Sequence, residues 1–521
     1  MKNLTNLKNF TFPIASGLLL TAAFPRTGLA PLAAVALIPL LLALRAARPG
    51  EAFRLGWVAG MVHALGLVYW IVPTLGTYGG LPVWVSVPLL GLLAAYLALY
   101  PAAFAGLLAG LRPPPAALPM LAPALWAALE YLRTHLLTGF PWALLGYSQY
   151  RQLHLIQISD MVGIYGVSFL LAALNAAGAL AAMAVAGWGW RGRPVSRKTA
   201  VAAAAATALL TAGVWGYGAW RLDQVDRMAG AAPVTRAAVV QGNIEQAVKW
   251  DPAFQESSVE KYIALSARAM ADRPELVVWP ETAAPFYFTR NRRLTEWVKA
   301  GVRKADAFFV VGSPSAERAG DGVELFNSAF LVRPDGQVAG RYDKFHLVPF
   351  GEYVPLEEFL PFVDKLVAQA GDFGTGQKGE VLRSAGHRLG VLICYEAIFP
   401  SLARAAARNR AGLLVNITND AWYGLSSAPY QHFSMAVLRA VETRRGLVRA
   451  ANTGISGFVD PSGRITGATG LFEDAVMTRP LPVLRTTTIY TRIGDLFAGL
   501  CLAGTLIFAI IRLHQWRRNR T

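Results

Sequence analysis

The sequence predicts two kinds of structure in one chain, a polytopic α-helical membrane domain and an α/β domain. Of its 521 residues, 54% are hydrophobic and only 16% are charged, whereas soluble domains carry about 25% charged residues. Long apolar runs fill residues 1–220 and 488–521, while residues 221–487 alternate short β-rich runs with helical patterns. We therefore expect a transmembrane domain over 1–220, an α/β domain over 221–487, and a last transmembrane helix with a basic tail over 488–521.

Eight apolar runs are candidates for membrane-spanning helices, each of which needs about 20 residues. The first is short, and the fourth contains Pro101 and is a candidate for a kinked or broken helix. A cleaved signal peptide over residues 2–25 is the alternative for the first run, but we find no convincing small-residue cleavage site. The eight runs lie near 10–25, 28–44, 55–76, 82–111, 117–132, 161–187, 199–219 and 490–511.

The distribution of basic residues predicts the orientation of these helices. With the N-terminus in the cytoplasm, fourteen Lys and Arg fall in cytoplasmic segments and three, Arg26, Arg133 and Arg151, fall in short outer loops. Cytoplasmic loops of membrane proteins carry such an excess. Seven crossings then place residues 221–487 outside, and the eighth helix returns the chain to a cytoplasmic tail. The net charge of +17 thus follows largely from topology and does not indicate nucleic-acid binding.

Residues 221–487 read as an α/β domain. The turn Pro334-Asp335-Gly336 predicts a hairpin, and the alternation of strands and helices predicts sheets covered by helices. We find neither a phosphate-cradling glycine motif nor an HExxH zinc motif, so we expect no metal and no nucleotide cofactor. Strands are expected at 237–243, 275–281, 307–314, 327–336, 388–396, 411–420 and 453–463, and helices at 253–272, 291–305 and 429–446.

Three chemically reactive side chains stand at the ends of expected strands: Glu281, Lys344 and Cys394. Ligands and catalytic groups gather at strand ends in α/β domains. A thiol with a pKa of about 8.5 needs help to attack a carbonyl at neutral pH, a carboxylate can remove its proton, and an ammonium can stabilise the oxyanion. Taken singly, each residue has a commoner structural role: a small core residue, a turn residue and a surface charge.

The only other cysteine, Cys501, lies in an apolar run, so the sequence predicts no disulfide framework. Cys394 would form an acyl-thioester, which splits one difficult acyl transfer into two easier steps. The backbone N–H of Tyr395 is the natural second donor to the oxyanion.

The blocks around these residues resemble the three catalytic blocks of the nitrilase, or carbon–nitrogen hydrolase, superfamily. They read WPET from Trp279, YDKFHLVPFGEYVP from Tyr342 and GVLICYE from Gly390. The resemblance implies an αββα sandwich with a Glu-Lys-Cys triad. Further matches at 139–147, 239–252 and 416–457, together with the helical frame, extend over essentially the whole chain. They make it similar to the membrane branch of that superfamily, the apolipoprotein N-acyltransferases.

The resemblance also implies roles for individual residues. Glu281 would be the general base, Lys344 the oxyanion stabiliser and Cys394 the nucleophile. Glu352 matches an additional active-site glutamate of the family, and the alternative is a loop carboxylate that only pairs with Lys344. A further set matches positions that shape the substrate site, with ordinary packing as an equally weighted alternative: Trp250, Tyr395 and Glu396.

The activity that the resemblance implies is a two-step acyl exchange without a cofactor. Cys394 would take an acyl chain from a membrane glycerophospholipid, and the free α-amino group of the N-terminal diacylglyceryl-cysteine of an apolipoprotein would attack the thioester. The implied location is the bacterial inner membrane, with the α/β domain in the periplasm, both termini in the cytoplasm, and no need for more than a monomer. A membrane-tethered amidase, a non-enzymatic scaffold and a transporter fit less well.

Some residues are left with open roles. The segment 354–376 mixes apolar and acidic residues and ends in glycines, which suggests a mobile lid that admits acyl chains through Phe359, Leu360 and Phe362. A fixed surface helix is the alternative. Ionisable residues near an apolar helix end are either functional or in the headgroup zone, and the two readings are even for Glu130, Arg133 and His135. For His346 and His432 we expect structural hydrogen bonds.

Overall fold

The structure is a computed structural model that describes residues 10–246, 249, 251–319, 322–353, 373–384 and 386–518. The chain divides into two compact units. A helical unit combines the residues up to Val72 with Pro82–Trp220 and the chain from Ile493 onward. An α/β unit combines Pro73–Leu81 with Arg221–Arg492. The domain boundaries at residues 220 and 487 stay a prediction. A compact unit is not by itself a domain, because a domain must also be able to fold independently.

Several helices of the chain are suited to a membrane. Among the described residues, four helices are long and apolar enough to cross one, α6, α10, α11 and α17, and α4 with α5 forms a pair bent by 48° that would be a fifth. Eight spans therefore stay a prediction. The helices are α2 (Thr11–Ala22), α3 (Ile38–Leu44), α4 (Pro49–Leu67), α5 (Ile71–Thr77), α6 (Val83–Leu111), α7 (Leu118–His135), α10 (Ile164–Val185), α11 (Arg197–Gly230) and α17 (Leu496–Arg518).

Proline placement explains where the expected helices differ from the observed ones. The run expected at 28–44 is a 3-10 turn followed by the short helix α3, and Pro39 stands in the first turn of α3. Proline lacks an N–H and is best tolerated at a helix start, so the chain begins a new helix there. By contrast, α6 is a single helix through Pro88 and Pro101.

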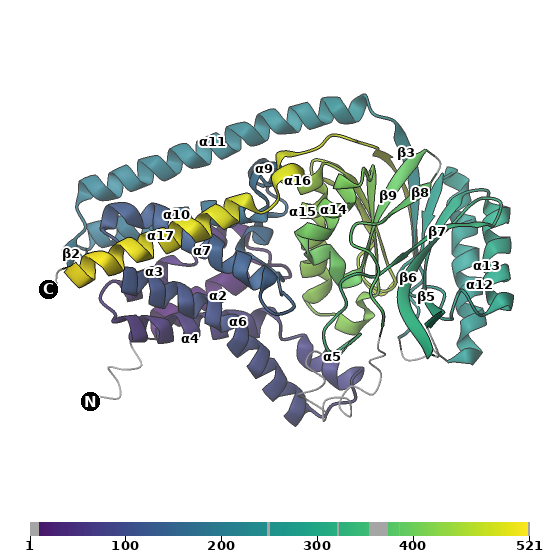
Figure 1. Cartoon of the computed structure of the whole chain (residues 1–521), viewed down its shortest axis with the longest axis horizontal. Coiled ribbons are helices and arrows are strands. Elements are labelled where there is room, and N and C mark those ends of the chain that lie inside the picture. The colour runs from purple at the N-terminus through teal and green to yellow at the C-terminus, as the bar shows by residue number, and fades with distance from the viewer. Residues whose placement is uncertain are drawn as a thin grey trace. The chain divides into compact units, whose positions relative to one another are not determined.

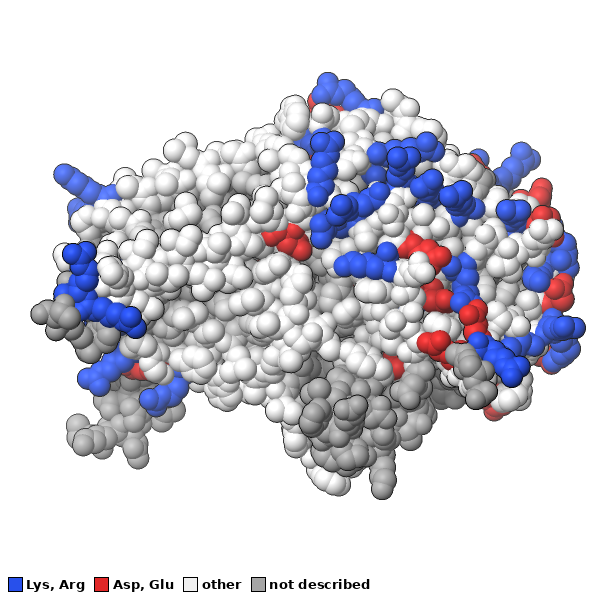
Figure 2. All heavy atoms as spheres, in the orientation of Figure 1, with Lys and Arg blue, Asp and Glu red and all other residues white. Residues whose placement is uncertain are grey.

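Small residues allow the helices of this unit to pack closely. A Cβ added to Gly60 of α4 would lie 2.7 Å from Ala98 Cα of α6, so the two backbones approach at this glycine. Such small-residue contacts are typical of helices that associate in membranes. On the face shown in Figure 2, this unit carries few charged residues, and Lys and Arg gather at the end where the C-terminus lies in Figure 1.

The α/β unit contains two six-stranded sheets. The first has the order β14-β3-β4-β5-β6-β7 and the second the order β13-β12-β11-β10-β9-β8. The strands are β3 (Val234–Gln241), β4 (Leu276–Val278), β5 (Phe308–Ala319), β6 (Gly322–Val332), β7 (Val338–Asp343), β8 (Val381–Ser384), β9 (His387–Ile393), β10 (Leu413–Thr418), β11 (Gly446–Ala451), β12 (Gly457–Val459), β13 (Ile465–Ala468) and β14 (Ala475–Pro482).

The two sheets pack face to face and are covered by helices on their outer faces. One apolar core joins residues of both sheets, among them Val239 and Val415. A second core packs α12 (Pro252–Ala269) and α13 (Arg292–Ala305) on the first sheet. Helices α14 (Pro400–Arg408) and α15 (Ala428–Thr443) lie on the side of the second sheet (Figure 1). The αββα sandwich is therefore confirmed, as is the hairpin between β6 and β7.

Several expected elements have different bounds, among them one helix and one strand. The helix expected at 429–446 ends at Thr443, because Arg444 takes a left-handed conformation with a φ of 53° and caps it. The next strand, β11, begins at Gly446 after two intervening residues and was not predicted. The strand expected at 453–463 is limited to β12.

Candidate active site

The three reactive residues lie where strands of the two sheets end. Glu281 follows β4, which runs parallel to β3 and β5. Lys344 directly follows β7, and Cys394 directly follows β9, which runs parallel to β10. Glu281 and Lys344 thus come from the first sheet and Cys394 from the second. All three side chains are buried.

Lys344 lies between two carboxylates. Its Nζ is 2.8 Å from Glu352 Oε2 and 3.7 Å from Glu281 Oε1. The side-chain amide of Asn327 donates to both carboxylates, at 2.8 Å to Glu281 Oε1 and 2.8 Å to Glu352 Oε1. The other oxygen of Glu281 accepts from the backbone N–H of Asn419 at 2.9 Å. Neutral donors, the Asn327 amide and the Asn419 N–H, therefore hold the Glu281 carboxylate in place. The Lys344 ammonium lies beside this carboxylate without a hydrogen-bond distance to it.

The charge on Lys344 is strongly favoured. Burial alone would lower the pKa of its ammonium, but Glu352 and Glu281 outweigh burial and raise this pKa well above its usual range. Lys344 is thus a fixed positive charge at neutral pH. Such a charge, held in a site that excludes water, is suited to stabilising an oxyanion.

Cys394 occupies a backbone conformation that non-glycine residues rarely adopt. Its φ is 52°, and left-handed geometry costs about 1–2 kcal/mol for an L-residue. Burial raises the pKa of the Cys394 thiol, the charge on Glu281 raises it further, and Lys344 opposes the increase. The thiol is therefore neutral at rest, and it needs a base at the moment of attack.

A buried network of charged and polar side chains contacts the main chain of the nucleophile. His432 Nε2 lies 3.0 Å from the carbonyl oxygen of Cys394, and His432 Nδ1 lies 3.0 Å from Asp420 Oδ1. Arg449 donates to Asp420 Oδ2 at 2.7 Å. Burial would raise the pKa of Asp420, but Arg449 and His432 lower it to about 2. The expected structural hydrogen bond of His432 is thus present, and its acceptor is the main chain of Cys394.

Glu396 ties the Cys394 segment to the Lys344 segment. Its side chain accepts from the Tyr342 hydroxyl at 2.9 Å and from the backbone N–H groups of Phe345 at 2.8 Å and Ile393 at 2.7 Å. Burial raises the pKa of Glu396 to about 7. These contacts therefore connect the residue before Cys394 to residues on both sides of Lys344.

The ring of Tyr395 packs among aromatic neighbours. Its centroid lies 5.1 Å from that of Phe399 and 5.9 Å from that of His346. Tyr395 is 5% exposed. These contacts show packing, and a role in substrate binding stays a prediction.

Three residues near this site were not identified from the sequence: Lys249, Asn327 and Asn419. Lys249 donates to the main-chain oxygen of Glu281 at 3.2 Å. No motif signals these residues, because their contacts bridge long stretches of chain. Lys249 and Asn419 do stand in the matched blocks 239–252 and 416–457, which was the available sign for these two.

Four residues named from the sequence lie outside the described residues: Trp250, Phe359, Leu360 and Phe362. Most of the segment expected as a lid lies outside them as well. Among the described residues, no group of three or more His, Cys, Asp or Glu side chains could hold a metal ion.

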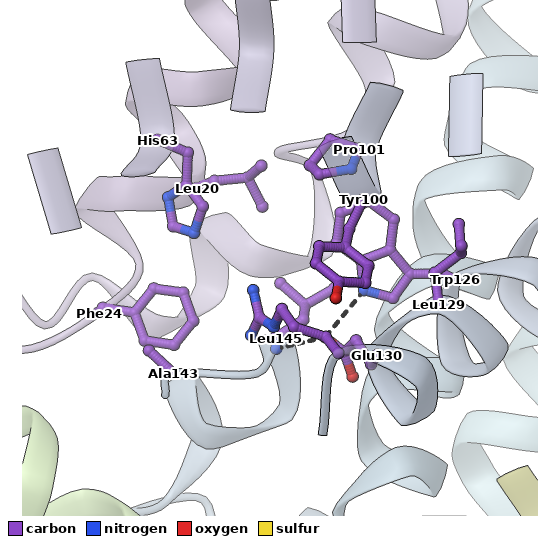
Figure 3. A pocket seen from close by; sticks show the side chains of 11 residues that line it. Leu20, Phe24, His63, Tyr100, Pro101, Trp126, Leu129, Glu130, Ala143 and Leu145 are labelled. Atoms are coloured by element: carbon purple, nitrogen blue, oxygen red, sulfur yellow. Dashed lines mark hydrogen bonds between the residues drawn. The ribbon is translucent and has the colours of Figure 1, made fainter. Parts of the chain in front are cut away.

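The helical unit has a polar cluster of its own, which lines a cavity (Figure 3). Glu130 is 6% exposed. Its Oε1 accepts from Trp126 Nε1 at 3.0 Å and from the backbone N–H of Leu145 at 2.7 Å. Arg133 donates to the main-chain oxygen of Trp142 at 3.1 Å. Both side chains thus hold the loop that follows α7.

His135, at the end of the same helix, differs from both. Its Nδ1 lies 2.9 Å from the carbonyl oxygen of Tyr131, and its Nε2 lies 3.9 Å from Asp495. The His135 side chain is 43% exposed. It therefore lies outside the cavity that Glu130 lines.

Comparison with known proteins places the chain in a family. A family model described as "Apolipoprotein N-acyltransferase N-terminal domain" matches residues 16–177, and one described as "Carbon-nitrogen hydrolase" matches residues 236–489. The apolipoprotein N-acyltransferase of Geobacter metallireducens is 47% identical over 98% of this chain and 96% of its own length. That of Methylococcus capsulatus is 34% identical over 95% and 94%.

Among solved structures, an amidase mutant from Nesterenkonia sp. AN1 is 22% identical, covers 51% of this chain and 96% of its own, and has a TM-score of 0.39. A carbon–nitrogen hydrolase from Helicobacter pylori is 16% identical over 51% and 94%, with a TM-score of 0.38. The relatives match both units of this chain together. The chain therefore belongs to the apolipoprotein N-acyltransferase family and is an acyltransferase of the carbon–nitrogen hydrolase superfamily.

Proposed function

We propose that this enzyme transfers an acyl chain from a membrane glycerophospholipid to the free α-amino group of the N-terminal diacylglyceryl-cysteine of apolipoproteins. The observation that carries the proposal is the 47% identity to an apolipoprotein N-acyltransferase over 98% of the chain. The buried thiol of Cys394, close to a carboxylate and an ammonium, supplies chemistry suited to acyl transfer.

In the first step, Glu281 takes the thiol proton and Cys394 Sγ attacks the ester carbonyl of the donor. Lys344 Nζ and the backbone N–H of Tyr395 stabilise the tetrahedral oxyanion. The intermediate collapses, and the C–O bond to the lysophospholipid breaks. The departing alkoxide takes the proton that Glu281 holds, so the step leaves a thioester on Cys394 and a neutral lysophospholipid.

In the second step, the α-amino nitrogen of the acceptor attacks the thioester carbonyl. Glu281 takes a proton from this nitrogen as the C–N bond forms. The C–S bond then breaks, and the Cys394 thiolate recovers its proton from Glu281. An amide is formed, a thioester is consumed and the enzyme returns to its starting state, so the cycle is ping-pong and needs no cofactor.

Glu352 supports this cycle through Lys344. It pairs with the ammonium at 2.8 Å and accepts the backbone N–H of Val348 at 2.8 Å. These contacts fix the side chain of Lys344 in one position. A catalytic cation held in this way needs no reorganisation when the oxyanion forms.

Both substrates are bound to the membrane through their acyl chains, which gives the apolar helices a purpose. Moving an acyl chain into water costs about 0.8 kcal/mol per CH₂, and a site at the bilayer surface avoids that cost. We place the enzyme in the bacterial inner membrane as a monomer, with the α/β unit in the periplasm and both termini in the cytoplasm. The excess of Lys and Arg in the segments assigned to the cytoplasm supports this orientation.

The segment 354–376 is proposed as a lid that admits acyl chains, with Trp250, Phe359, Leu360 and Phe362 in contact with substrate. Replacing Phe359, Leu360 and Phe362 by Ser removes apolar area from the segment. The KM for phospholipid should therefore rise several-fold, because each Å² of apolar area that no longer covers the acyl chain weakens binding by about 25 cal/mol. Unchanged acylation kinetics would remove the lid from the proposal.

The central experiment follows the acyl chain. Detergent-solubilised enzyme is incubated with a phospholipid that carries a labelled acyl chain, and the label is located by mass spectrometry. The expected result is label on Cys394, absent from Cys394→Ala, that moves to the amine of a diacylated lipopeptide added later. Label released only as free fatty acid despite the lipopeptide would favour a membrane-tethered amidase and overturn the proposal.

A further inference from the structure

A second lysine lies in the active site and has no role in the cycle above. Lys249 is 1% exposed, although lysine is almost never fully buried without a partner. Its Nζ donates to the main-chain oxygen of Glu281 at 3.2 Å. Burial lowers the pKa of Lys249 to about 8, and the charge of Glu281 opposes the decrease, as Cys394 does when it is ionised. Of the described residues, these two are the ionisable groups that act on its ammonium.

The segment that carries Lys249 is anchored to the loops around the nucleophile. Asn452 accepts from the backbone N–H of Ile244 at 2.9 Å and donates to its carbonyl oxygen at 2.7 Å. Asn419, whose backbone N–H binds Glu281, donates to Gln246 at 2.6 Å. Lys249 itself is placed beside Glu281 by its own hydrogen bond to the main-chain oxygen of that residue.

The charges of the site are incomplete without Lys249. Lys344 pairs with Glu352 at 2.8 Å and lies farther from Glu281, at 3.7 Å. Two carboxylates and one ammonium leave one excess negative charge next to Cys394, where the reaction must create another. Uncompensated charge in a buried site is costly. A second ammonium beside Glu281 balances the charges of Glu281 and Glu352 before the reaction begins.

We propose that Lys249 is the second cation of the active site, that it stabilises negative charge on Glu281 and Cys394, and that its deprotonation sets the upper pH limit of acyl transfer. Only the part of this inference that concerns the pH limit of acyl transfer rests on the proposed function. Its effect on Cys394 is independent of which substrate the enzyme uses. Because Lys249 acts through Glu281 and Cys394, it is a positioning residue and does not itself bond to substrate.

The variants are Lys249→Arg, which keeps the charge at all accessible pH values, and Lys249→Met, which removes it. Lys299→Met, on α13 at the surface, is the control for loss of a lysine. All are made in a Cys501→Ala background, so that Cys394 is the only thiol.

The first measurement is the rate of Cys394 alkylation by iodoacetamide at pH 7, which needs no acyl substrate. The second is acyl-enzyme formation from labelled phosphatidylglycerol between pH 6 and 9, which avoids the acceptor amine.

Lys249→Met should alkylate at least about 10-fold more slowly than the parent, because a neighbouring opposite charge shifts a pKa by about 1–3 units. The parent should lose acyl-enzyme formation as pH rises through about 8, and Lys249→Arg should stay active with this decline moved upward by at least about one pH unit. Lys299→Met should match the parent in both measurements.

Any of three results would overturn the inference. The first is a Lys249→Met variant that alkylates as fast as the parent. The second is a Lys249→Arg variant whose acyl-enzyme formation declines at the same pH as that of the parent. The third is a loss of activity in both the Arg and the Met variant, which is what a merely structural role of Lys249 requires. If alkylation depends on Lys249 but no acyl chain is ever transferred, the proposed function fails and the second cation stands.

Discussion

Each unit of this chain contains a buried carboxylate close to a basic side chain, and the two sites are built differently. In the helical unit, Glu130 and Arg133 both come from α7, and both bind the main chain of one loop. In the α/β unit, Glu281 comes from one segment and Lys344 with Glu352 from another, and the side chain of Lys344 meets both carboxylates. The first arrangement uses its polar atoms to fix a loop. The second brings charges together beside a thiol, which is the arrangement that chemistry needs.

The largest effect in this comparison should come from Lys344→Met. Removing one oxyanion stabiliser costs about 10²–10³-fold in rate, and the loss also leaves Glu352 without its cation. We expect acyl-enzyme formation to fall by at least about 100-fold, measured as label on Cys394 in a time course. Lys261→Met, which removes a half-exposed lysine paired with Asp474, is the control and should retain the parent rate. A Lys344→Met variant within a few-fold of the parent would show that Lys344 is not the cation of the reaction.

The sequence predicted Glu281, Lys344 and Cys394 as residues of this second site because each stands in a recognisable block near the end of a strand. It could not identify Asn327 or Lys249, because their roles depend on distant contacts: Asn327 bridges Glu281 and Glu352, and Lys249 reaches back to the main chain of Glu281. A single block carries no information about such contacts.

The sequence also predicted the main elements of the fold but not all of its strands and helix boundaries. Alternation of strands and helices predicted the α/β sandwich, but β14 was missed because it contains Pro480 and Pro482 and pairs with β3 far away in the sequence. Proline is tolerated on an edge strand, which β14 is. In the helical unit, hydropathy located the apolar runs. It could not locate the break before Pro39, since local backbone geometry decides where a helix restarts.

A smaller effect, and one on stability, is expected behind the nucleophile. Asp420→Asn leaves Arg449 without its buried counter-charge, which costs about 3–5 kcal/mol in the free energy of unfolding. The folded pKa of Asp420 is about 2, below the unfolded value of about 3.9. The Asp420 contribution is therefore complete above the unfolded pKa and disappears as pH falls through about 4 to 2.

Denaturant unfolding of the parent and of Asp420→Asn at several pH values tests this directly. The difference between the two proteins should shrink by about 2 kcal/mol between pH 7 and pH 2. Asp474→Asn, which breaks a surface ion pair with Lys261, is the control and should cost less than about 1 kcal/mol at any pH. A difference that does not depend on pH would mean that the charge on Asp420 does not hold this network.

The smallest effect on the reaction is expected from Glu130, which would sharpen the contrast between the two sites. Glu130→Ala leaves the N–H of Leu145 without its acceptor, and an unsatisfied buried donor costs about 1–3 kcal/mol. Glu130→Gln keeps an oxygen in place for Leu145 and Trp126, so it should cost less. Both variants should form acyl-enzyme within a few-fold of the parent, because Glu130 and Arg133 hold a loop of the helical unit.

Thermal unfolding gives the stability of both variants, and label on Cys394 gives their rates. The informative outcome is a Glu130→Gln variant that is as stable as the parent yet as inactive as Lys344→Met. Because the glutamine preserves the loop contacts, such a result could come only from the lost charge. Glu130 would then bind a substrate group in the cavity of Figure 3, and the helical unit would contain a functional site of its own.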